Sequence, residues 1–428
     1  MPESKLTSLL HRLHTALAPE ALTMIGVETG FMQRERTITP ATLIPSLIST
    51  LGTGKVETLA DLTRAFVGFV GVDVSYKAYH DRLSLEGFPK MMQRVFERLC
   101  AQLIMQSLRF LPQSPFSCFK AISIQDGTSY ALHDGLKERF PGRFNTVKPA
   151  AIELHATLDL LTETLTKVSL APDTESERAF LPDPASLAGV LLLADRGYPS
   201  FAYLKTVEEA GGSFVMRAKG NLTSWVLGAH VGGHLVELEE AVPLPDYIKQ
   251  HDAGLLDLLI EPRTGSGFHV LRMVVIKTTK GRIYLLTNLP ADEFSAEMVG
   301  LAYRLRWQVE LMFKEWKSYA NLHAFVTRDP HIAEGLVWAS LCAAVLKRFL
   351  AQVAQHVGHV AISTRKSAMM LGNRLSELLK QVCFGADHQG DPFKETINFL
   401  IRNAKRSHPK RERRIGRQQL GLRPCFGG

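Results

Sequence analysis

Cysteine is scarce in this chain of 428 residues, and the few that occur are widely scattered. No two of them form a Cys-x-x-Cys pair, so the sequence does not indicate a zinc ribbon. An odd, dispersed set does not indicate a disulfide framework either. We therefore expect buried thiols. The five cysteines are Cys100, Cys118, Cys342, Cys383 and Cys425.

Long uncharged apolar runs are also missing. No stretch of about 18 apolar residues is free of charge, so we expect no membrane-spanning helix. The N-terminal segment MPESKLTSLLHRLH lacks the apolar core of a signal peptide. The chain has 46% hydrophobic and 21% charged residues, as in a globular protein. We expect a cytoplasmic protein, with about two to four domains for this length.

The rest of the chain has no net charge when it is summed without a basic segment near the C-terminus. The chain carries +8, but residues 402–423 hold nine basic residues and one acid, and removing them leaves 41 residues of each sign. This segment could bind DNA phosphates electrostatically, or it could be a solvated terminal segment that binds nothing. Its basic residues are Arg402, Lys405, Arg406, Lys410, Arg411, Arg413, Arg414, Arg417 and Arg423.

The first 110 residues have apolar positions at helical spacing. Within them, LADLTRAF, then VGFVGVDVS, then YKAYHDRL predict a helix, a glycine-containing turn and a second helix. Such a pair is compatible with a helix-turn-helix DNA reader. It is equally common in helical domains that bind no DNA.

From about residue 119 the apolar pattern changes to short strand-like runs, with a helix-like stretch, FAYLKTVEEA, between the last two. This order indicates a mixed α/β core. Segments of residues 220–290 are β-like and separated by turn residues, which predicts an all-β insertion. A helical pattern resumes at residue 293 and continues to about 382.

One predicted helix carries four polar or amphipathic side chains on a narrow stripe. At about 100° per residue, they fall within roughly 60° of one another. A salt-bridged surface is one explanation, since Arg306 and Glu310 are spaced i,i+4. The four residues are Tyr303, Arg306, Glu310 and Lys317.

Two acids follow apolar strands upstream of this helix. Asp126 closes the run AISIQD, and Asp195 closes LLLAD. Either acid alone would be explained as a turn former or a helix cap. Together with Glu310 they form the minimum set of carboxylates for a site that holds two hard cations such as Mg²⁺ or Mn²⁺. Two such ions can promote phosphoryl transfer.

These motifs, in this order, resemble those of insertion-sequence DDE transposases that have a Tyr–Arg–Glu–Lys signature, the insertion sequence four family. Asp126 is followed by Gly-Thr and Asp195 by Arg-Gly-Tyr, as in the family's motifs. The signature Y-x-x-R-x-x-x-E-x-x-x-x-x-x-K matches without a gap from Tyr303 to Lys317. The resemblance covers residues 119–325 directly.

The resemblance implies a ribonuclease H-like α/β core with an all-β insertion, flanked by helical N- and C-terminal regions. Asp126 would lie on the first core strand, Asp195 after the fourth, and Glu310 on a later helix. The expected division is 1–115 (helical, binding DNA ends), 116–219 with 291–328 (catalytic core), 220–290 (insertion), 329–401 (helical, with a dimer contact) and 402–428 (basic tail).

The resemblance also implies an activity. Asp126, Asp195 and Glu310 would be catalytic and would hold two Mg²⁺ or Mn²⁺ ions. Arg306 and Lys317 would contact phosphates, and Tyr303 would position terminal nucleotides. The expected partners are the terminal inverted repeats of the transposon, target DNA and a second copy of the chain in the synaptic complex. Cut-and-paste movement is the expected outcome, and no membrane is involved.

Further residues have two explanations each. Arg217 and Lys219 follow a predicted strand and could contact end DNA, or they could be ordinary solvated charges. Trp225 and Trp307 could stack on an unpaired base, although packing is the commoner role of a tryptophan. His155 lies on a predicted core strand, and we interpret it as structural.

Two alternative functions remain open on sequence grounds. A ribonuclease H-like nuclease would hydrolyse DNA without joining it, and the helical flanks and the signature argue against this. A DNA-binding protein derived from a transposase would have lost catalysis, and the presence of all three acids argues against that.

Overall fold

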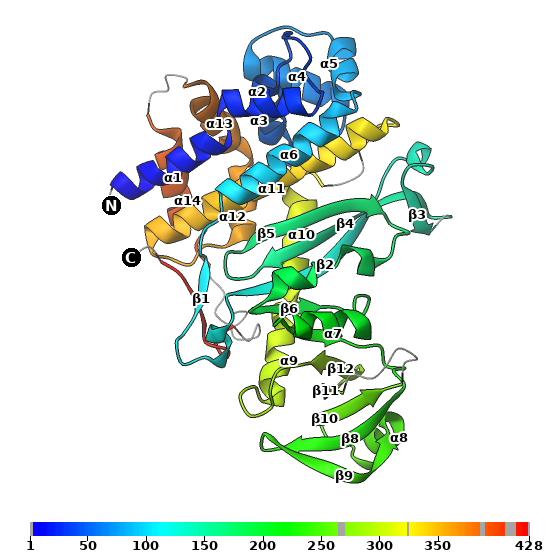
Figure 1. Ribbon diagram of the computed structural model, residues 1–428. Helices are drawn as coiled ribbons and strands as arrows, with labels where there is room; N and C mark the ends of the chain where they lie inside the picture. The colour runs from blue at the N-terminus through cyan, green and yellow to red at the C-terminus, as the bar shows by residue number, and fades with distance from the viewer. Residues whose placement is uncertain are drawn as a thin grey trace.

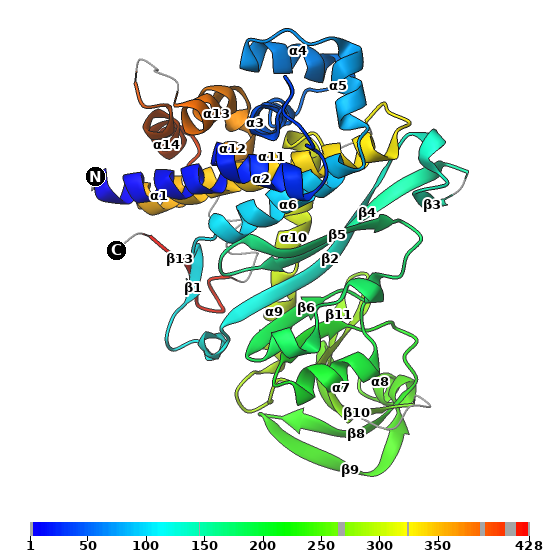
Figure 2. The same ribbon diagram turned by 45° about the horizontal axis from the view of Figure 1, so that its top comes forward.

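The computed structural model describes residues 3–144, 146–263, 270–322, 325–385, 390–406 and 417–426. Helices from both ends of the chain gather in the upper part of the molecule, and a long sheet extends below them (Figure 1). The view turned by 45° shows the same two parts (Figure 2).

The N-terminal region is helical, as predicted, up to residue 102. Its helices are α1 (Glu3–Ala16), α2 (Pro19–Glu28), α3 (Pro40–Leu51), α4 (Leu59–Val70), α5 (Tyr76–Leu83) and α6 (Gly87–Gln102). The predicted helix pair is α4 and α5. Thr58 caps α4 in a capping box with Asp61, and Gly71 ends that helix in the left-handed conformation, with φ at 77°.

A single large sheet forms the middle of the molecule. Its strand order is β3-β4-β2-β6-β7-β12-β11-β10-β8-β9, with β5 also paired to β4. The first six strands of this sheet in chain order are β2 (Ala121–Ala131), β3 (Pro141–Phe144), β4 (Lys148–Asp159), β5 (Thr164–Pro172), β6 (Val190–Ala194) and β7 (Ser213–Arg217). Helix α7 (Phe201–Glu209) joins the last two.

The core of this sheet has the topology expected from the resemblance. Strand β4 is antiparallel to both β2 and β5, whereas β2, β6 and β7 run parallel. The order β5-β4-β2-β6-β7 is that of a ribonuclease H-like core. Strand β6 is buried along its whole length, as a strand covered on both faces must be.

The segment 220–290 is rich in strands, but the prediction that it is all-β was wrong. Helix α8 (Leu244–Gln250) interrupts it, where Pro245 occupies a first-turn position that suits proline. Its strands also extend the central sheet, because β12 pairs with β7. They are β8 (Ser224–Val231), β9 (His234–Pro243), β10 (Leu255–Pro262), β11 (Leu271–Thr278) and β12 (Gly281–Thr287).

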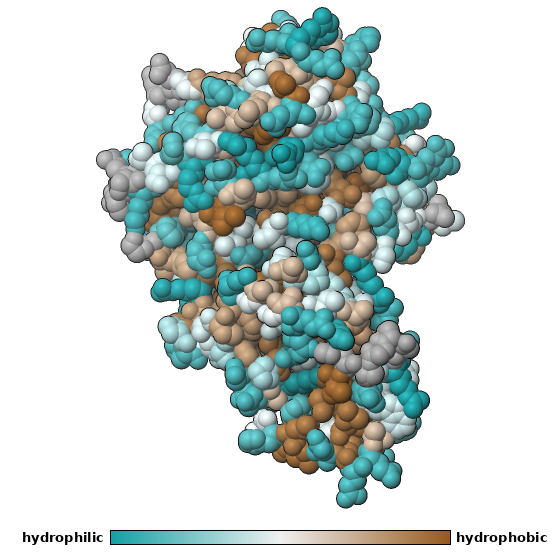
Figure 3. Space-filling view, in the orientation of Figure 1, coloured by the Kyte–Doolittle hydropathy of each residue, from teal (hydrophilic) through white to brown (hydrophobic). Residues whose placement is uncertain are grey.

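Exposed apolar side chains gather on this lower end of the molecule. Figure 3 shows apolar surface over the strands of the 220–290 segment. Val231 is 65% exposed, Val236 is 56% exposed and Leu235 is 39% exposed.

The helix predicted to carry the Tyr–Arg–Glu–Lys stripe is divided into two. Helix α9 (Ala296–Leu305) ends just before Arg306, and α10 (Trp307–Tyr319) begins just after it. The Arg306 amide donates to the Tyr303 carbonyl, three residues back, and the Val309 amide donates likewise to the Arg306 carbonyl. This local tightening separates the two helices, which still follow one another behind the sheet (Figures 1 and 2).

The C-terminal helices close the upper part of the molecule. They are α11 (Pro330–Gly358), α12 (Thr364–Leu371), α13 (Leu375–Phe384) and α14 (Pro392–Asn403). Short 3₁₀ helices occur at η1 (Pro115–Cys118), η2 (Asp134–Leu136), η3 (Glu177–Phe180), η4 (Pro184–Leu187) and η5 (Gly372–Arg374).

Helix α11 is the core of this helical region. It is long and apolar enough to cross a membrane, yet 89% of its most apolar window is buried inside the chain. It packs against α6, α3, α12 and α14. A dimer contact through residues 329–401, which the sequence led us to expect, would therefore have to use the other helices of this region.

The basic C-terminal segment is not a simple tail. Arg402 lies in the last turn of α14, and strand β13 (Leu422–Pro424) pairs with β1 (Leu108–Phe110). Strand β1 therefore corrects the expectation that residues 1–115 are entirely helical. Arg417 is only 4% exposed. Four of the predicted tail's basic residues lie outside the described residues: Lys410, Arg411, Arg413 and Arg414.

The thiols are less uniformly buried than expected. Cys342 and Cys383 are buried, whereas Cys118 is exposed and Cys100 and Cys425 are partly exposed. All five are free.

Candidate active site

The two strand-borne acids lie at the same level of the sheet. Strand β2 is parallel to β6, and the last pair in their register is Gln125 with Ala194. Asp126 and Asp195 each follow directly, so both lie where the two strands part. Each carboxylate accepts a hydrogen bond from the next backbone amide, at 2.9 Å for Asp126 and 2.8 Å for Asp195.

Asp126 does not close its strand, contrary to the prediction. Strand β2 continues to Ala131 because its other edge remains paired with β4, as far as Ala151. Asp126 instead marks the point where β2 loses its parallel neighbour. That position leaves its side chain 15% exposed, whereas the four residues before it, 122–125, are buried.

The helix junction brings Arg306 into the middle of the three acids. Its Nη1 lies 2.6 Å from Asp126 Oδ2, and its Nη2 lies 2.7 Å from Glu310 Oε1. The same Nη2 is 3.9 Å from Asp195 Oδ2. Three carboxylates from a strand, a strand end and a helix thus surround one guanidinium.

Tyr303 also contacts the residues at the centre of the site. Its hydroxyl donates to Asp195 Oδ1 at 3.0 Å, and its ring lies beneath the Arg306 guanidinium, 5.6 Å from ring centroid to Cζ. Burial raises the pKa of the Tyr303 phenol, and the charge of Asp195 raises it further. The phenol therefore stays protonated and can act as a donor.

The electrostatics of the site favour a bound cation. Burial raises the pKa of Asp126 to about 6, and the charges of Asp195 and Glu310 add to this, although Arg306 opposes it. Burial also works against the charge of Arg306, but the neighbouring Asp126 and Asp195 carboxylates raise the pKa of Arg306 above its usual value. The carboxylates therefore hold more negative charge than a single guanidinium balances.

The outer basic residues differ in how they are placed. The Lys317 Nζ donates to the Ser129 carbonyl of β2 at 2.9 Å, and the side chain is exposed. Burial of its stem and the nearby Lys148 lower the pKa of Lys317. Arg217 ends β7 with its Nη1 3.8 Å from Asp195 Oδ1. Lys219 is exposed.

The carboxylates have the chemistry of a divalent-cation site, although they are not assembled as one. Among the residues that the structure describes, no group of three or more His, Cys, Asp or Glu side chains is arranged to hold a metal. The Asp126, Asp195 and Glu310 oxygens nevertheless converge on one cation, the Arg306 guanidinium. Oxygen donors of this kind suit Mg²⁺ or Mn²⁺.

The aromatic and histidine predictions have mixed outcomes. Trp307 is 56% exposed beside the site, so packing does not explain it, and Lys314 lies over its ring. Trp225 is half-buried, with the Arg263 guanidinium 4.5 Å from its ring centroid. His155 is a core residue, as interpreted from the sequence, and stacks on Phe180 at 3.8 Å.

One buried acid near the site was missed. Glu153 lies on β4 and is 4% exposed, and its carboxylate is 3.4 Å from the Arg143 guanidinium. Burial raises the pKa of Glu153 to about 7. A Cβ at Gly127 would come within 2.7 Å of its Oε1, so the glycine after Asp126 makes room for this carboxyl group. An acid inside the apolar alternation of IELHATLD is the signal that could have identified it.

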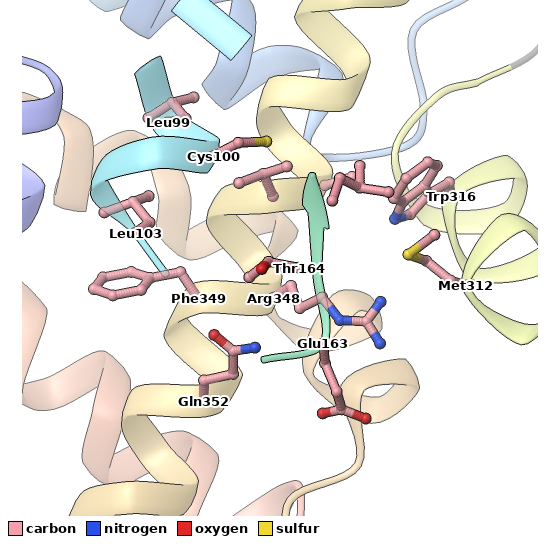
Figure 4. Close-up of a pocket in the computed structure, with 13 residues that line it drawn as sticks. Leu99, Cys100, Leu103, Glu163, Thr164, Met312, Trp316, Arg348, Phe349 and Gln352 are labelled. Atoms are coloured by element: carbon pink, nitrogen blue, oxygen red, sulfur yellow. The ribbon is translucent and has the colours of Figure 1, made fainter. Parts of the chain in front are cut away.

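The far side of α10 packs against the helical region around a small cavity of about 20 Å³, room for about one water. Figure 4 shows Met312 and Trp316 reaching from α10 toward side chains of α6 and α11. Arg417 contacts both Gln308 of α10 and Glu163, which is 3.3 Å away. The C-terminal segment therefore supports the helix that carries Glu310.

Comparisons with known proteins agree with this geometry. The family described as "Transposase DDE domain" matches residues 118–346. The chain is 50% identical over 66 residues to the transposase for insertion sequence element IS421 from Escherichia coli, a match that spans 15% of this chain and only 18% of that protein. It is 20% identical to the transposase for IS231E from Bacillus thuringiensis subsp. finitimus, covering 95% of this chain and 93% of that protein.

A solved structure shares the fold. A piggyBac transposase, seen by cryo-EM in a synaptic complex with hairpin DNA, superposes with a TM-score of 0.51 at 12% identity. The match covers 94% of this chain and 86% of the other. Because the family match extends over more than half of the sequence and includes all three acids, the chain belongs to the transposase DDE domain family.

Proposed function

We propose that this chain is a metal-dependent transposase of the insertion-sequence type with the Tyr–Arg–Glu–Lys signature, which cleaves transposon ends and joins them to target DNA. The observation that carries the proposal is the convergence of Asp126, Asp195 and Glu310 on the Arg306 guanidinium. Carboxylates brought together from three elements, in a family of DDE domains, suit phosphoryl transfer better than a structural role.

The chain's own residues would hold the DNA. Arg306 and Lys317 would bind phosphates on either side of the scissile bond, and Tyr303 would position the terminal nucleotides. Arg217 would add a further phosphate contact beside Asp195, and Lys219 a more distant one. Exposed Trp307 would stack on a base displaced from the duplex end.

Asp126, Asp195 and Glu310 would hold two Mg²⁺ or Mn²⁺ ions, which activate the attacking oxygen and stabilise the leaving one when bound. In the first reaction, water attacks the phosphorus, the bond to the 3′ oxygen breaks, and a free 3′-hydroxyl remains. In the second, that hydroxyl attacks a phosphorus of the opposite strand or of target DNA, the bond from that phosphorus to its own 3′ oxygen breaks, and a new phosphodiester forms while a 3′-hydroxyl is released.

We further propose a role for each region. Residues 1–115 bind the terminal inverted repeats, 116–219 with 291–328 form the catalytic core, and 220–290 form the insertion. Residues 329–401 support a homodimer in the synaptic complex, and the basic segment 402–428 adds electrostatic affinity for DNA. The protein would then act on the nucleoid in the cytoplasm, without a membrane.

Cleavage of labelled duplexes that carry the ends of the element encoding the chain tests the proposal. We expect Mg²⁺-dependent nicks at the transposon ends, and joining of pre-cleaved ends to a target plasmid. A denaturing gel separates hairpin ends from linear ones and so shows how the second strand is cut.

Two results would favour the alternatives. Nicking without joining of pre-cleaved ends would indicate a ribonuclease H-like nuclease. Specific binding of the ends with no nicking in Mg²⁺ or Mn²⁺ would indicate a transposase-derived DNA-binding protein.

The pH dependence of cleavage should follow Asp126. Because burial raises its pKa to about 6, the carboxylate loses its charge at a higher pH than an ordinary aspartate, whose pKa is about 3.9. We expect the cleavage rate at low Mg²⁺ to be level above pH 7 and to fall about tenfold per pH unit below pH 6. Higher Mg²⁺ should move the fall to lower pH, since the ion and the proton compete. A rate that stays level to pH 5 at low Mg²⁺ would contradict this assignment.

A further inference from the structure

The N-terminal helices enclose a polar hollow that the catalytic site does not use. Its volume is about 960 Å³, and it lies between the loop that follows α2 and the segment made of the α4–α5 loop and helix α5. That end of the molecule is largely hydrophilic (top of Figure 3). The polar side chains that line the hollow are Gln33, Arg34, Arg36, Thr37, Asp73, Ser75, Asp81 and Arg82.

Arg82 at the wall of this hollow lacks the partners that a buried guanidinium needs. Its Nε and Nη2 are buried and have no hydrogen-bond partner. Its Cζ lies 4.4 Å from the centroid of the Phe31 ring, on which the guanidinium stacks. Buried donors without acceptors cost free energy, and no acceptor among the described residues bonds these two atoms, so the positive charge of Arg82 is not compensated there.

The hollow contains more positive charge than its acids balance. Arg36 lies near enough to Arg82 to lower its pKa, which burial lowers first. Among the described residues, no carboxylate pairs with Arg34, Arg36 or Arg82. One of the two acids in the wall, Asp81, is already paired with Lys77 at 2.7 Å. Arginines held together without a carboxylate between them favour a bound anion.

The wall is held in place by close packing. Phe31 is 1% exposed, and a Cβ at Gly87 would come within 2.4 Å of the Phe31 backbone nitrogen. The chain therefore fits at this contact only because residue 87 is glycine. Ser75 caps the start of α5 and fixes the helix that carries Arg82.

We propose that this hollow, between the α2–α3 loop and the segment made of the α4–α5 loop and helix α5, is a binding site for backbone phosphates of duplex DNA. Exposed Arg36 is its main donor, Arg82 adds positive charge at the wall, and Arg34 also lines the hollow. The proposal rests on the proposed function, because it identifies where the N-terminal region grips the transposon end. Duplex DNA supplies regularly spaced phosphates, and guanidinium groups bind them through charge-assisted hydrogen bonds.

The test is fluorescence anisotropy of the full chain with a labelled duplex carrying the transposon end, in EDTA over a series of salt concentrations. For Arg36→Ala combined with Arg82→Ala we expect about a tenfold or greater loss of affinity. The slope of log Kd against log salt should shrink by about two units, because each phosphate contact contributes about 0.9. Arg36→Ala alone should shrink it by about one unit.

Arg94→Ala is the matched control. Arg94 is a basic residue on α6, paired with Glu97 and outside the hollow, so the same loss of charge there should leave the slope unchanged. Since Arg82 stacks on Phe31, its removal could loosen the fold. Arg36 is exposed, so its replacement should not disturb the fold, and the single variant can be interpreted even if the double variant unfolds. Thermal unfolding of each variant identifies any loss of folded protein. The proposal would be overturned if the slope of log Kd against log salt were the same in the Arg36 variant, the double variant and the control.

Failure of this proposal is distinct from failure of the proposed function. If the wild-type chain cleaves ends and the hollow variants bind as it does, the phosphate site is wrong and the transposase stands. If the variants lose affinity and the wild-type chain never cleaves, the phosphate site stands and catalysis is wrong.

Discussion

Replacing Glu310 by glutamine is expected to lower the rate of end cleavage by about a thousandfold or more, with the affinity for duplex DNA unchanged. Glutamine has the same size and can still accept the hydrogen bond from Arg306, which is 2.7 Å from the Glu310 carboxylate. It cannot supply the negative charge that a divalent ion requires. The fold at the α9–α10 junction should therefore survive while the reaction stops.

Single-turnover cleavage of a labelled transposon end, with anisotropy for binding, measures both quantities. Glu138→Gln is a suitable control, because Glu138 is an exposed acid of the same core with no contact to the site. Asp126→Asn and Asp195→Asn should behave as Glu310→Gln does. Full cleavage activity in any of these three variants would contradict the assignment of the carboxylates.

The sequence predicted the three acids because each belongs to a local pattern. Asp126 and Asp195 follow short apolar runs, and parallel pairing of β2 with β6 then sets them side by side. Glu310 stands at fixed spacing from Arg306 on a helical stretch. The order of these motifs and their resemblance to the family pointed to the three residues, and strand register brings Asp126 and Asp195 together.

The details of the backbone around these acids could not be predicted. The tightened turn at Arg306 results from two i→i−3 hydrogen bonds, which no apolar pattern encodes. The continuation of β2 beyond Asp126 results from pairing with β4, a neighbour more than 20 residues later. The first is a matter of local backbone geometry and the second of pairing with a distant strand, and the apolar pattern of one element shows neither.

The charge pattern misled in a similar way. The charge count predicted a basic tail at residues 402–428. In the structure, however, Arg417 is buried against Glu163, which lies more than 250 residues earlier. The arginines of the N-terminal hollow gave no comparable signal, since the 12 basic and 10 acidic residues of positions 1–110 are spread along the chain. Only the structure shows that Arg36 and Arg82 line the same hollow.

Replacing Arg306 by alanine should destabilise the metal-free protein strongly at alkaline pH. The guanidinium is 12% exposed and is the cation shared by Asp126, Glu310 and Asp195. Breaking such a buried ion pair on one side costs about 3 kcal/mol in the free energy of unfolding. At pH 8, well above the pKa of about 6 of Asp126, that carboxylate is charged, so we expect about that loss in urea unfolding measured in EDTA.

The sign of the pH effect follows from Asp126. Its pKa in the folded chain is raised to about 6, above the usual 3.9, so the folded state binds more protons than the unfolded state between these values. Stability therefore falls as pH rises from about 4 to about 6. Without Arg306 the three acids repel one another more strongly, so in the variant the fall should be steeper and extend above pH 6.

Mg²⁺ should reverse the loss, because a divalent ion can take over the charge balance that Arg306 provides. We expect added Mg²⁺ to stabilise Arg306→Ala more than the wild-type chain at pH 8, while end cleavage stays about a hundredfold slower for want of the phosphate contact. Arg304→Ala is the control, since Arg304 is an exposed neighbour on α9. If the two variants unfold alike at pH 8 in EDTA, Arg306 is not the cation that holds the carboxylates together.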